Sequence, residues 1–367
     1  MPLPASLGMP GMAEMSFPCS GKPATWRDHR SLPYRPDHKD ASRHSRSMNH
    51  RLTRYLGPAL TLGLIVGAFV LLFRSLSEMR LPELWHDLHE FKLSAILTAA
   101  GLTVVSHLAL TSYDYIGVRY IKRKLAYWRV ALAAFTAYSI SHSLGFASVT
   151  GTTIRYRLYS RWGFGAVEVA QIMAMAGVTL FLGMFLIGGV AMLLDGGRVQ
   201  DWSDLPSYTV NALGVLCLTL VAAYGSVGYW RKEPLSLWGF QLRVPSPGFA
   251  GVQIAVSGID WLLVASVLYV LLPRNDVFNF ATFLGVFVLA YFLGIISNVP
   301  GGLGVFEAVI LKSLHGSVPP EAVLSSLLVY RGVYHLLPLV IGGVIFAVNE
   351  WKRSQERAQR RGLAEGS

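Results

Sequence analysis

The string Pro-Gly-Gly-Leu-Gly, at residues 300–304, is the feature of this sequence with the clearest potential for chemistry. It lies near the end of a 30-residue stretch, Val277–Phe306, that carries no formal charge. Proline cannot donate a backbone hydrogen bond, and glycine weakens a helix. In a membrane, such a break is tolerated where protein buries it or water lines it, and transport sites are often built this way. The alternative, an ordinary loop between two helices, stays open at this point.

Arg331, between Tyr330 and Gly332 in the last apolar run, is the residue most in need of a partner. Its guanidinium stays charged, and a charge at the centre of a bilayer costs about 2.5–3.5 kcal/mol on insertion scales. Glu307, close behind the glycine-rich string, and Asp260, in an earlier apolar run, are carboxylates expected at a similar depth. Arg331 is therefore either one member of a buried ion pair or part of a site for an anionic headgroup.

A second broken segment, Ser141–Arg157, combines hydroxyl groups, glycine and arginine in a similar way. Arg155 and Arg157, at its end, are expected to meet a headgroup at the cytoplasmic surface. The other interpretation of interfacial arginines is a general attraction of anionic lipids, worth about 1 kcal/mol each. The helix expected to open at about Leu303 would add free backbone amides, which suit a phosphate or carboxylate.

Two further groups of polar residues have plainer expected roles. Asp114, near the inner end of its apolar run, is expected to pair with Arg119 or Lys122 rather than to carry protons. Three isolated histidines are expected to be hydrogen-bonded core residues: His107, His142 and His335.

The composition places the chain in the membrane class. Hydrophobic residues make up 53% and charged residues only 14%, with a mean hydropathy of +0.44, whereas soluble domains carry about 25% charged residues. The net charge of +11 is concentrated in polar segments between apolar runs, as in cytoplasmic loops, which argues against nucleic-acid binding. Cys19 and Cys217 cannot form a disulfide framework, and the sequence contains no metal, nucleotide or catalytic motif. We therefore expect no catalytic residue and no cofactor.

Six apolar stretches are long enough to cross roughly 30 Å of hydrocarbon. They are Leu56–Phe73, Leu93–Val118, Val169–Leu194, Ser207–Trp230, Phe249–Leu272 and Ala322–Asn349. Two other apolar runs, Val130–Ile154 and Val277–Leu314, are interrupted by glycine or proline.

Lysine and arginine in the short loops predict the orientation. Basic segments flank Val130–Ile154, so both of its ends face the cytoplasm and the run returns as a re-entrant hairpin. The acidic segment Asp195–Pro206 faces outward, and both termini are cytoplasmic. Val277–Leu314 must then leave from and return to the outside, either as a hairpin that turns at Pro300–Gly304 or as two full crossings.

The chain divides into three parts by composition. Residues 1–50 are expected to form a disordered basic cytoplasmic tail, residues 51–350 the membrane domain, and residues 351–367 a basic cytoplasmic C-terminal tail. Met48 is a candidate for the true start, because the ordered-looking sequence begins just after it.

The predicted orientations imply an internal symmetry. The order span, span, hairpin, span runs along Leu56–Leu194 and again, with opposite orientation, along Ser207–Asn349. The second span of each half carries an aspartate, Asp114 or Asp260. Inverted repeats with paired broken elements are found in transporters, whose sites lie at the repeat interface. The sequence therefore predicts an all-α polytopic membrane protein of about eight membrane elements, with an inverted 4+4 repeat as a hypothesis.

A family resemblance rests on four strings of this sequence. They are Thr136–Gly145, Thr150–Ser160, Ser297–Glu307 and Tyr330–Tyr334 followed by Pro338. In these strings the chain resembles the membrane domain of bacterial lysylphosphatidylglycerol synthase/flippase proteins, and the likeness covers about residues 52–350. The string Pro-Gly-Gly-Leu-Gly-Val-Phe-Glu is fairly specific, whereas hydrophobic spans alone are not.

The resemblance implies a membrane domain that flips aminoacylated phosphatidylglycerol, joined in two-domain members to a synthase that transfers the amino acid from tRNA. The chain departs from those members, because a short basic tail ending at Ser367 stands in place of the synthase domain. Aminoacyl transfer is therefore not carried over. We expect a non-enzymatic protein of the stand-alone branch in the bacterial inner membrane, acting on an anionic or aminoacylated phospholipid or a polyprenyl-linked lipid.

The combined expectation is a lipid flippase whose headgroup site is formed by nine residues. They are Pro300, Gly301, Gly302, Gly304, Glu307, Tyr330, Arg331, Arg155 and Arg157, with Asp114 and Asp260 as charge partners. Movement would be passive or ion-coupled, because the sequence contains no nucleotide site. Two alternatives are a membrane subunit of a separately encoded lipid-modifying synthase and a scaffold that binds a membrane partner.

Overall fold

The computed structural model describes residues 91–144, 147–194, 206–231, 233, 235–237, 240–242, 244–273, 279–297 and 299–365. The chain divides into two units, residues 1–57 and 58–367, and every described residue belongs to the second. Three expectations from the sequence lie outside the described residues. They are the tail of residues 1–50, the start at Met48 and the span Leu56–Phe73.

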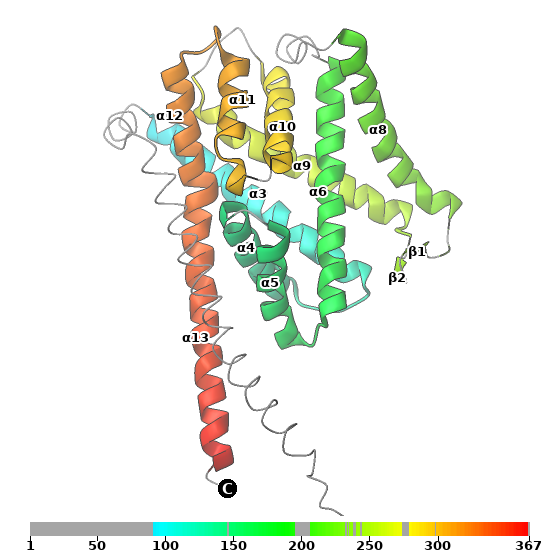
Figure 1. Ribbon diagram of the computed structural model, residues 1–367, viewed down its shortest axis with the longest axis vertical. Coiled ribbons are helices and arrows are strands. Elements are labelled where there is room, and N and C mark those ends of the chain that lie inside the picture. The colour runs from blue at the N-terminus through cyan, green and yellow to red at the C-terminus, as the bar shows by residue number, and fades with distance from the viewer. Residues whose placement is uncertain are drawn as a thin grey trace, which may run out of the picture. The chain divides into compact units, whose positions relative to one another are not determined.

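Five helices of the described chain are long and apolar enough to cross a membrane. Four are single helices, and the fifth joins a helix, a π-helical segment and a long C-terminal helix (Figure 1). They are α3 (Leu93–Tyr120), α6 (Ala166–Leu194), α8 (Ser207–Trp230), α9 (Pro247–Leu271) and the run of α12 (Pro320–Tyr330), η3 (Arg331–Leu336) and α13 (Leu337–Glu365). Five of the six predicted uninterrupted spans are thereby confirmed, and the chain is an all-α polytopic membrane protein.

Two pairs of shorter helices occupy the two interrupted runs. α4 (Tyr127–Leu144) packs along α5 (Ala147–Tyr159), and α10 (Phe280–Ile296) packs along α11 (Val305–Leu314), with the short η2 (Pro300–Gly302) between the last two. The pairs extend toward each other from opposite ends of the helix bundle, and their turns meet near its middle (Figure 1). At 1.5 Å per residue, α11 is roughly 15 Å long, about half of a hydrocarbon core. α5, with 13 residues, is also too short to cross alone, so both interrupted runs are hairpins rather than pairs of full crossings.

The two hairpin turns meet in a close backbone contact. A Cβ atom built on Gly301 would lie 3.5 Å from the carbonyl oxygen of His142, in the last turn of α4. Gly301 and Gly302 both have a φ of 63°, a left-handed conformation that glycine adopts without steric cost. The glycine-rich string is therefore required by the shape of the turn itself.

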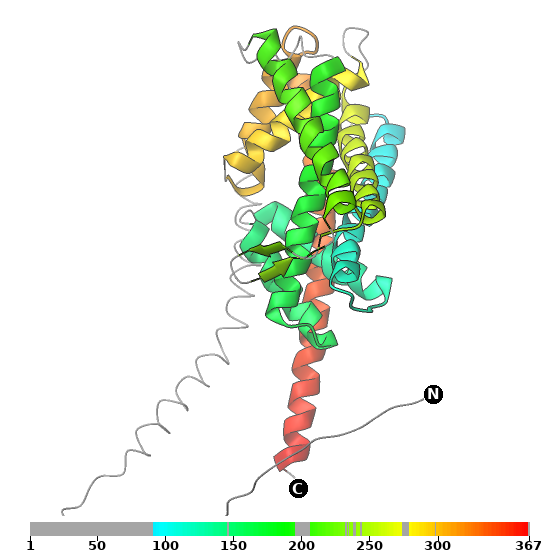
Figure 2. The same cartoon turned by 90° about the vertical axis from the view of Figure 1, so that its right-hand side faces the viewer.

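The long helices pair across the two halves of the chain. α3 and α9 lie side by side, and α6 packs against both α8 and α9 (Figures 1 and 2). The second spans of the two halves are thus neighbours, and the two hairpins meet turn to turn. The inverted 4+4 repeat stays a prediction, because its first span, Leu56–Phe73, lies outside the described residues.

Two features of the fold differ from the expectation or go beyond it. A short antiparallel pair of strands, β1 (Leu235–Leu237) and β2 (Phe240–Leu242), lies between α8 and α9. The helix α13 runs without a break past residue 350 to Glu365. Its last part is rich in Glu, Arg, Gln and Ala, which favour helix. Residues 351–365 therefore continue the helix of the last span beyond its apolar part.

Small residues and interhelical hydrogen bonds hold the long helices together, because lipid gives them no hydrophobic reason to associate. The Gln253 amide nitrogen donates to Thr179 Oγ1 (2.8 Å), and Tyr224 OH donates to the Gln253 amide oxygen (2.7 Å). These two bonds join α6, α8 and α9. Where α6 crosses α9, a Cβ atom on Gly183 would lie 2.6 Å from the Ser257 carbonyl oxygen. The crossing therefore has no room for a larger residue.

Replacement of Gly183 by alanine is expected to destabilise the bundle by about 1–3 kcal/mol, because α6 and α9 would have to move apart. The matched control is Gly343→Ala, since a Cβ atom at that helical glycine meets nothing within 4 Å. The measurement is the unfolding of each purified variant in detergent. Equal stabilities of the two variants would contradict the close α6–α9 crossing.

Single cysteines at positions 124 and 315 are expected to react from opposite sides of the membrane, in a chain whose Cys19 and Cys217 are replaced by serine. Lys124 lies just before α4 and His315 just after α11, so they mark the outer ends of the two hairpins, and both are exposed. The measurement is the labelling of oriented vesicles with an impermeant maleimide. Labelling of both positions from one side would rule out opposed hairpins.

Candidate functional site

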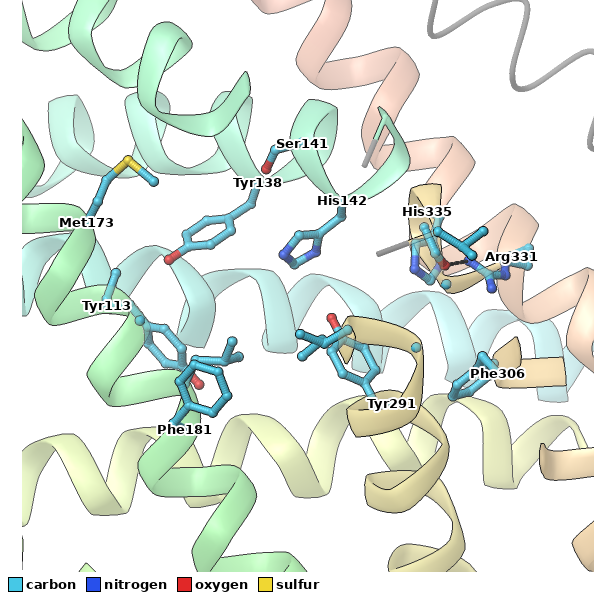
Figure 3. Close-up of a pocket in the computed structure, with 18 of the residues that line it drawn as sticks. Tyr113, Tyr138, Ser141, His142, Met173, Phe181, Tyr291, Phe306, Arg331 and His335 are labelled. Atoms are coloured by element: carbon cyan, nitrogen blue, oxygen red, sulfur yellow. Dashed lines mark hydrogen bonds between the residues drawn. The ribbon is translucent and has the colours of Figure 1, made fainter. Parts of the chain in front are cut away.

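A cavity of about 590 Å³ lies where the two hairpin turns meet. Both hairpins, α3, α6, the end of α12 and η3 contribute to its wall (Figure 3). Its polar side chains are Tyr113, Tyr138, Ser141, His142, Arg155, Tyr291, Tyr330, Arg331 and His335. The rest of the wall is glycine or apolar, so the cavity offers a polar part and an apolar part.

Arg331 fastens the glycine-rich turn to η3. Its Nε donates to Glu307 Oε1 at 2.8 Å, and its Nη2 lies 2.6 Å from the same oxygen. Its Nη1 donates to the Gly301 carbonyl oxygen at 2.8 Å. Glu307 Oε2 in turn accepts a hydrogen bond from the Gly304 amide at 2.8 Å. Of the two carboxylates expected for Arg331, Glu307 is therefore its partner.

Arg331 keeps binding capacity toward the cavity. A guanidinium has five N–H donors, and the contacts with Glu307 and Gly301 use three of them, so two have no partner among the described residues. The side chain is 12% exposed, and its guanidinium carbon lies 5.7 Å from the centre of the Phe306 ring. Arg331 can therefore receive an anion while it keeps its protein contacts.

Arg155 and Asp114 form a second buried ion pair, on the α4–α5 side of the cavity. Arg155 Nε donates to Asp114 Oδ2 (2.8 Å) and Nη2 to Oδ1 (2.9 Å), and Tyr159 OH donates to Oδ2 (3.1 Å). The expected pairing of Asp114 with Arg119 or Lys122 is wrong. Asp114 faces the interior and is 0% exposed, and such a carboxylate needs a close, well-aligned cation.

The two arginines at the end of the first hairpin have different environments. Arg155 is 2% exposed, borders the cavity and lies over the Tyr138 ring, 4.2 Å from its centre. It is therefore buried inside the protein, whereas it was expected at a membrane surface. Arg157 is not part of the cavity wall, and its Nη1 lies 3.7 Å from Glu350 of α13. Only Arg155 is positioned to meet a group in the cavity.

Asp260 contacts neither of the two arginines that border the cavity. Its Oδ1 accepts a hydrogen bond from Ser106 Oγ (2.7 Å) and its Oδ2 one from Tyr113 OH (2.9 Å), both on α3. The expectation that Asp260 balances the charge of Arg331 is therefore wrong in the described chain.

The glycine-rich turn contributes to the cavity mainly through its shape. Of its residues, Gly301 and Gly302 are part of the wall, Gly304 and Glu307 are not, and Pro300 begins η2. The Gly302 amide donates to the Val299 carbonyl oxygen at 2.9 Å, and the Gly304 amide donates to Glu307. These two amides are used within the turn, so they do not meet a headgroup as expected.

Most of the polar side chains of the wall were not predicted as site residues from the sequence. Tyr113, Tyr138 and Tyr291 line the cavity, and so do His142 and His335, which were expected to be hydrogen-bonded core residues (Figure 3). A single Tyr or His in an apolar run gives no signal of the residues that it will meet. The meeting of the two hairpins brings them together.

Two polar atoms of the wall are buried and have no hydrogen-bond partner within the described chain. They are Tyr330 OH and His335 Nδ1. An unsatisfied buried polar group costs about 1–3 kcal/mol. Both atoms are covered by protein, so a ligand in the cavity would reach them only after a side chain of the wall moves. In the same part of the chain, no cluster of three His, Cys, Asp or Glu residues could hold a metal ion.

Comparisons with known proteins agree with this architecture. The chain is 34% identical over 265 residues to the uncharacterized protein slr0712 of Synechocystis sp., an alignment that covers 72% of this chain and 81% of that protein. It is 28% identical over 315 residues to the inner membrane protein YbhN of Escherichia coli, covering 85% of this chain and 98% of that protein.

A longer relative is similar over only part of its length. The chain is 25% identical over 309 residues to the phosphatidylglycerol lysyltransferase of Staphylococcus xylosus, which covers 82% of this chain but 34% of that enzyme. The family described as the lysylphosphatidylglycerol synthase TM region matches residues 60–342. This chain therefore belongs to the family of the lysylphosphatidylglycerol synthase transmembrane region.

Proposed function

We propose that this protein moves a lipid with an anionic headgroup between the leaflets of the bacterial inner membrane, and that the headgroup passes through the cavity. The observation that carries the proposal is the cavity at the meeting point of two opposed hairpins, bordered by two arginines. Broken elements that meet midway form substrate sites in transporters. The inner-membrane location follows the E. coli relative, and the lipid class follows the phosphatidylglycerol in the staphylococcal name.

The polar part of the cavity suits a phosphate with hydroxyl groups around it. Arg331 and Arg155 come from the two sides of the hairpin contact, and a guanidinium matches phosphate oxygens in geometry and charge. A diacylglycerol phosphate would use both guanidinium groups.

The apolar part of the cavity suits the beginning of an acyl chain. Phe181, Ile295 and Val299 line the cavity, yet they are 37%, 39% and 38% exposed. In a membrane, exposed apolar side chains of this kind face lipid. A headgroup in the cavity could therefore keep its acyl chains in the bilayer while it moves.

We propose both termini on the cytoplasmic side, as the basic loops indicate, and no aminoacyl transfer by this chain. The name lysyltransferase belongs to a protein of which this chain covers about a third. If the transported lipid is aminoacylated, a separately encoded synthase is the partner that supplies it.

The double variant Arg331→Gln/Glu307→Gln is expected to fold and to lose lipid movement by about tenfold or more. Arg331→Gln alone should destabilise the protein by about 3–5 kcal/mol, because the Glu307 carboxylate would stay almost buried without its cation. The double variant removes both charges, so no unpaired charge stays buried. Its loss of transport would reflect the missing contact with phosphate, worth about 1.5–3 kcal/mol, together with the missing contacts of Arg331 with the glycine-rich turn. The measurement is the exchange of fluorescent phosphatidylglycerol between leaflets of proteoliposomes.

The matched control is Arg123→Gln/Glu168→Gln, which neutralises an ion pair whose side chains are 41% and 32% exposed. Surface pairs of this kind contribute about 0–1 kcal/mol, so stability and lipid movement should stay near those of the unaltered protein. Normal lipid movement by a stable Arg331→Gln/Glu307→Gln variant would show that the pair has a structural role and does not bind the headgroup. Unchanged leaflet distribution with the unaltered protein, across several lipid classes, would overturn the proposed function.

A further inference from the structure

Asp260 is a buried carboxylate for which the proposed lipid movement gives no role. It lies on α9 and is 4% exposed, and among the described residues it accepts hydrogen bonds only from Ser106 and Tyr113. Asp114 and Glu307 each have an arginine nitrogen within 3 Å, whereas Asp260 is not part of any ion pair among the described residues. A buried carboxylate without a cation is costly, and a bound proton removes that cost.

The titratable groups that surround Asp260 are neutral phenols. They come from five elements that surround it: Tyr113 of α3, Tyr138 of α4, Tyr291 of α10, Tyr330 of α12 and Tyr334 of η3. The acidic residue of α6, Glu168, is bound to Arg123 at the start of that helix, and Tyr224 of α8 bonds Gln253 instead. In the part of the chain that the structure describes, no fixed charge next to Asp260 decides its protonation.

Hydrogen bonds link Asp260 to the cavity wall on one side and to η3 on the other. Tyr113, which donates to Asp260 Oδ2, is itself part of the cavity wall. On the other side, Ser106 Oγ lies 3.1 Å from Tyr334 OH, and Tyr334 belongs to the π-helical segment η3. That segment also carries Arg331 and His335, and π-helical segments are frequent at functional sites. A change at Asp260 can therefore reach the wall through Tyr113 and reach η3 through Ser106 and Tyr334.

We propose that Asp260 is a proton-binding site that couples lipid movement to a proton gradient. The coupling rests on the proposed function, whereas the proton site does not. Both hydroxyl neighbours now donate to the carboxylate, as its ionised form requires. One proton from water, bound at Oδ2, forms an O–H bond there and makes the carboxyl a donor. Tyr113 OH must then accept a hydrogen bond from Asp260, so its own O–H has to donate to another group. Because Tyr113 borders the cavity, the cavity is where such a group is available. Release of the proton to water reverses the change.

The proton site is tested by pH-difference infrared spectra of the purified full-length protein in lipid nanodiscs. A carbonyl band of a protonated carboxyl group is expected to grow as the pH falls and to be missing from Asp260→Asn. The band should remain in Glu168→Gln, which alters a partly exposed carboxylate, and its midpoint should shift in Tyr113→Phe, which removes one donor. A band that persists in Asp260→Asn, or no band in the unaltered protein, would overturn the proposal.

The coupling is tested with fluorescent phosphatidylglycerol in proteoliposomes, with and without a pH gradient. The unaltered protein should move the lipid several-fold faster with the gradient than without it. The Asp260→Asn variant should move the lipid at the same rate under both conditions. Equal rates for the unaltered protein would overturn the coupling and leave the proposed function standing. No lipid movement under either condition would overturn the proposed function together with the coupling, and the infrared titration would still decide whether Asp260 binds a proton.

Discussion

Two arginines that cannot lose their charge lie inside this helix bundle, and most of the site depends on how that charge is held. Arg155 is held by Asp114 and Arg331 by Glu307, with nitrogen–oxygen distances of 2.6–2.9 Å. Each pair joins a hairpin to a long element: α5 to α3 in one case, α11 to η3 in the other. Because an arginine in this environment needs its carboxylate, the pairs fix where the two hairpins lie and hence where the cavity is.

Buried ion pairs are weak evidence for stability, because the desolvation of both charges offsets much of their attraction. Their value here is the arrangement that they impose. The pairs keep two guanidinium groups at the edge of one cavity, whereas their carboxylates are not part of its wall. An anionic group in the cavity would meet positive charge on two sides. The uncompensated carboxylate, Asp260, lies outside the cavity wall and is linked to it by hydroxyl groups.

The sequence predicted the architecture of the described chain well. Apolar length alone located five spans, and loop charges predicted that Val130–Ile154 and Val277–Leu314 turn back on themselves. These features are local, because a span or a basic loop is visible within about 20 residues. Glu307 was also named as a partner of Arg331, since both were expected at the same depth.

The partners of the other charged residues depend on which helix faces which, and one sequence does not contain that information. Asp114 was assigned to nearby Arg119 or Lys122 by proximity in sequence, yet its partner, Arg155, is 41 positions away. Asp260 was assigned by depth alone, and the side-by-side packing of α3 and α9 gives it Ser106 and Tyr113 instead. For the same reason the cavity tyrosines and histidines were not expected to share one wall.

The central claim is that the cavity between the hairpin turns receives an anionic lipid headgroup. An experimentally determined structure of the full chain in phosphatidylglycerol nanodiscs tests it most directly. The account predicts density for a phosphate within hydrogen-bonding distance of Arg331 or Arg155, with acyl chains leading from the cavity past Phe181 and Ile295. A cavity free of lipid density, with ordered phosphatidylglycerol only on the outer surface of the bundle, would contradict it.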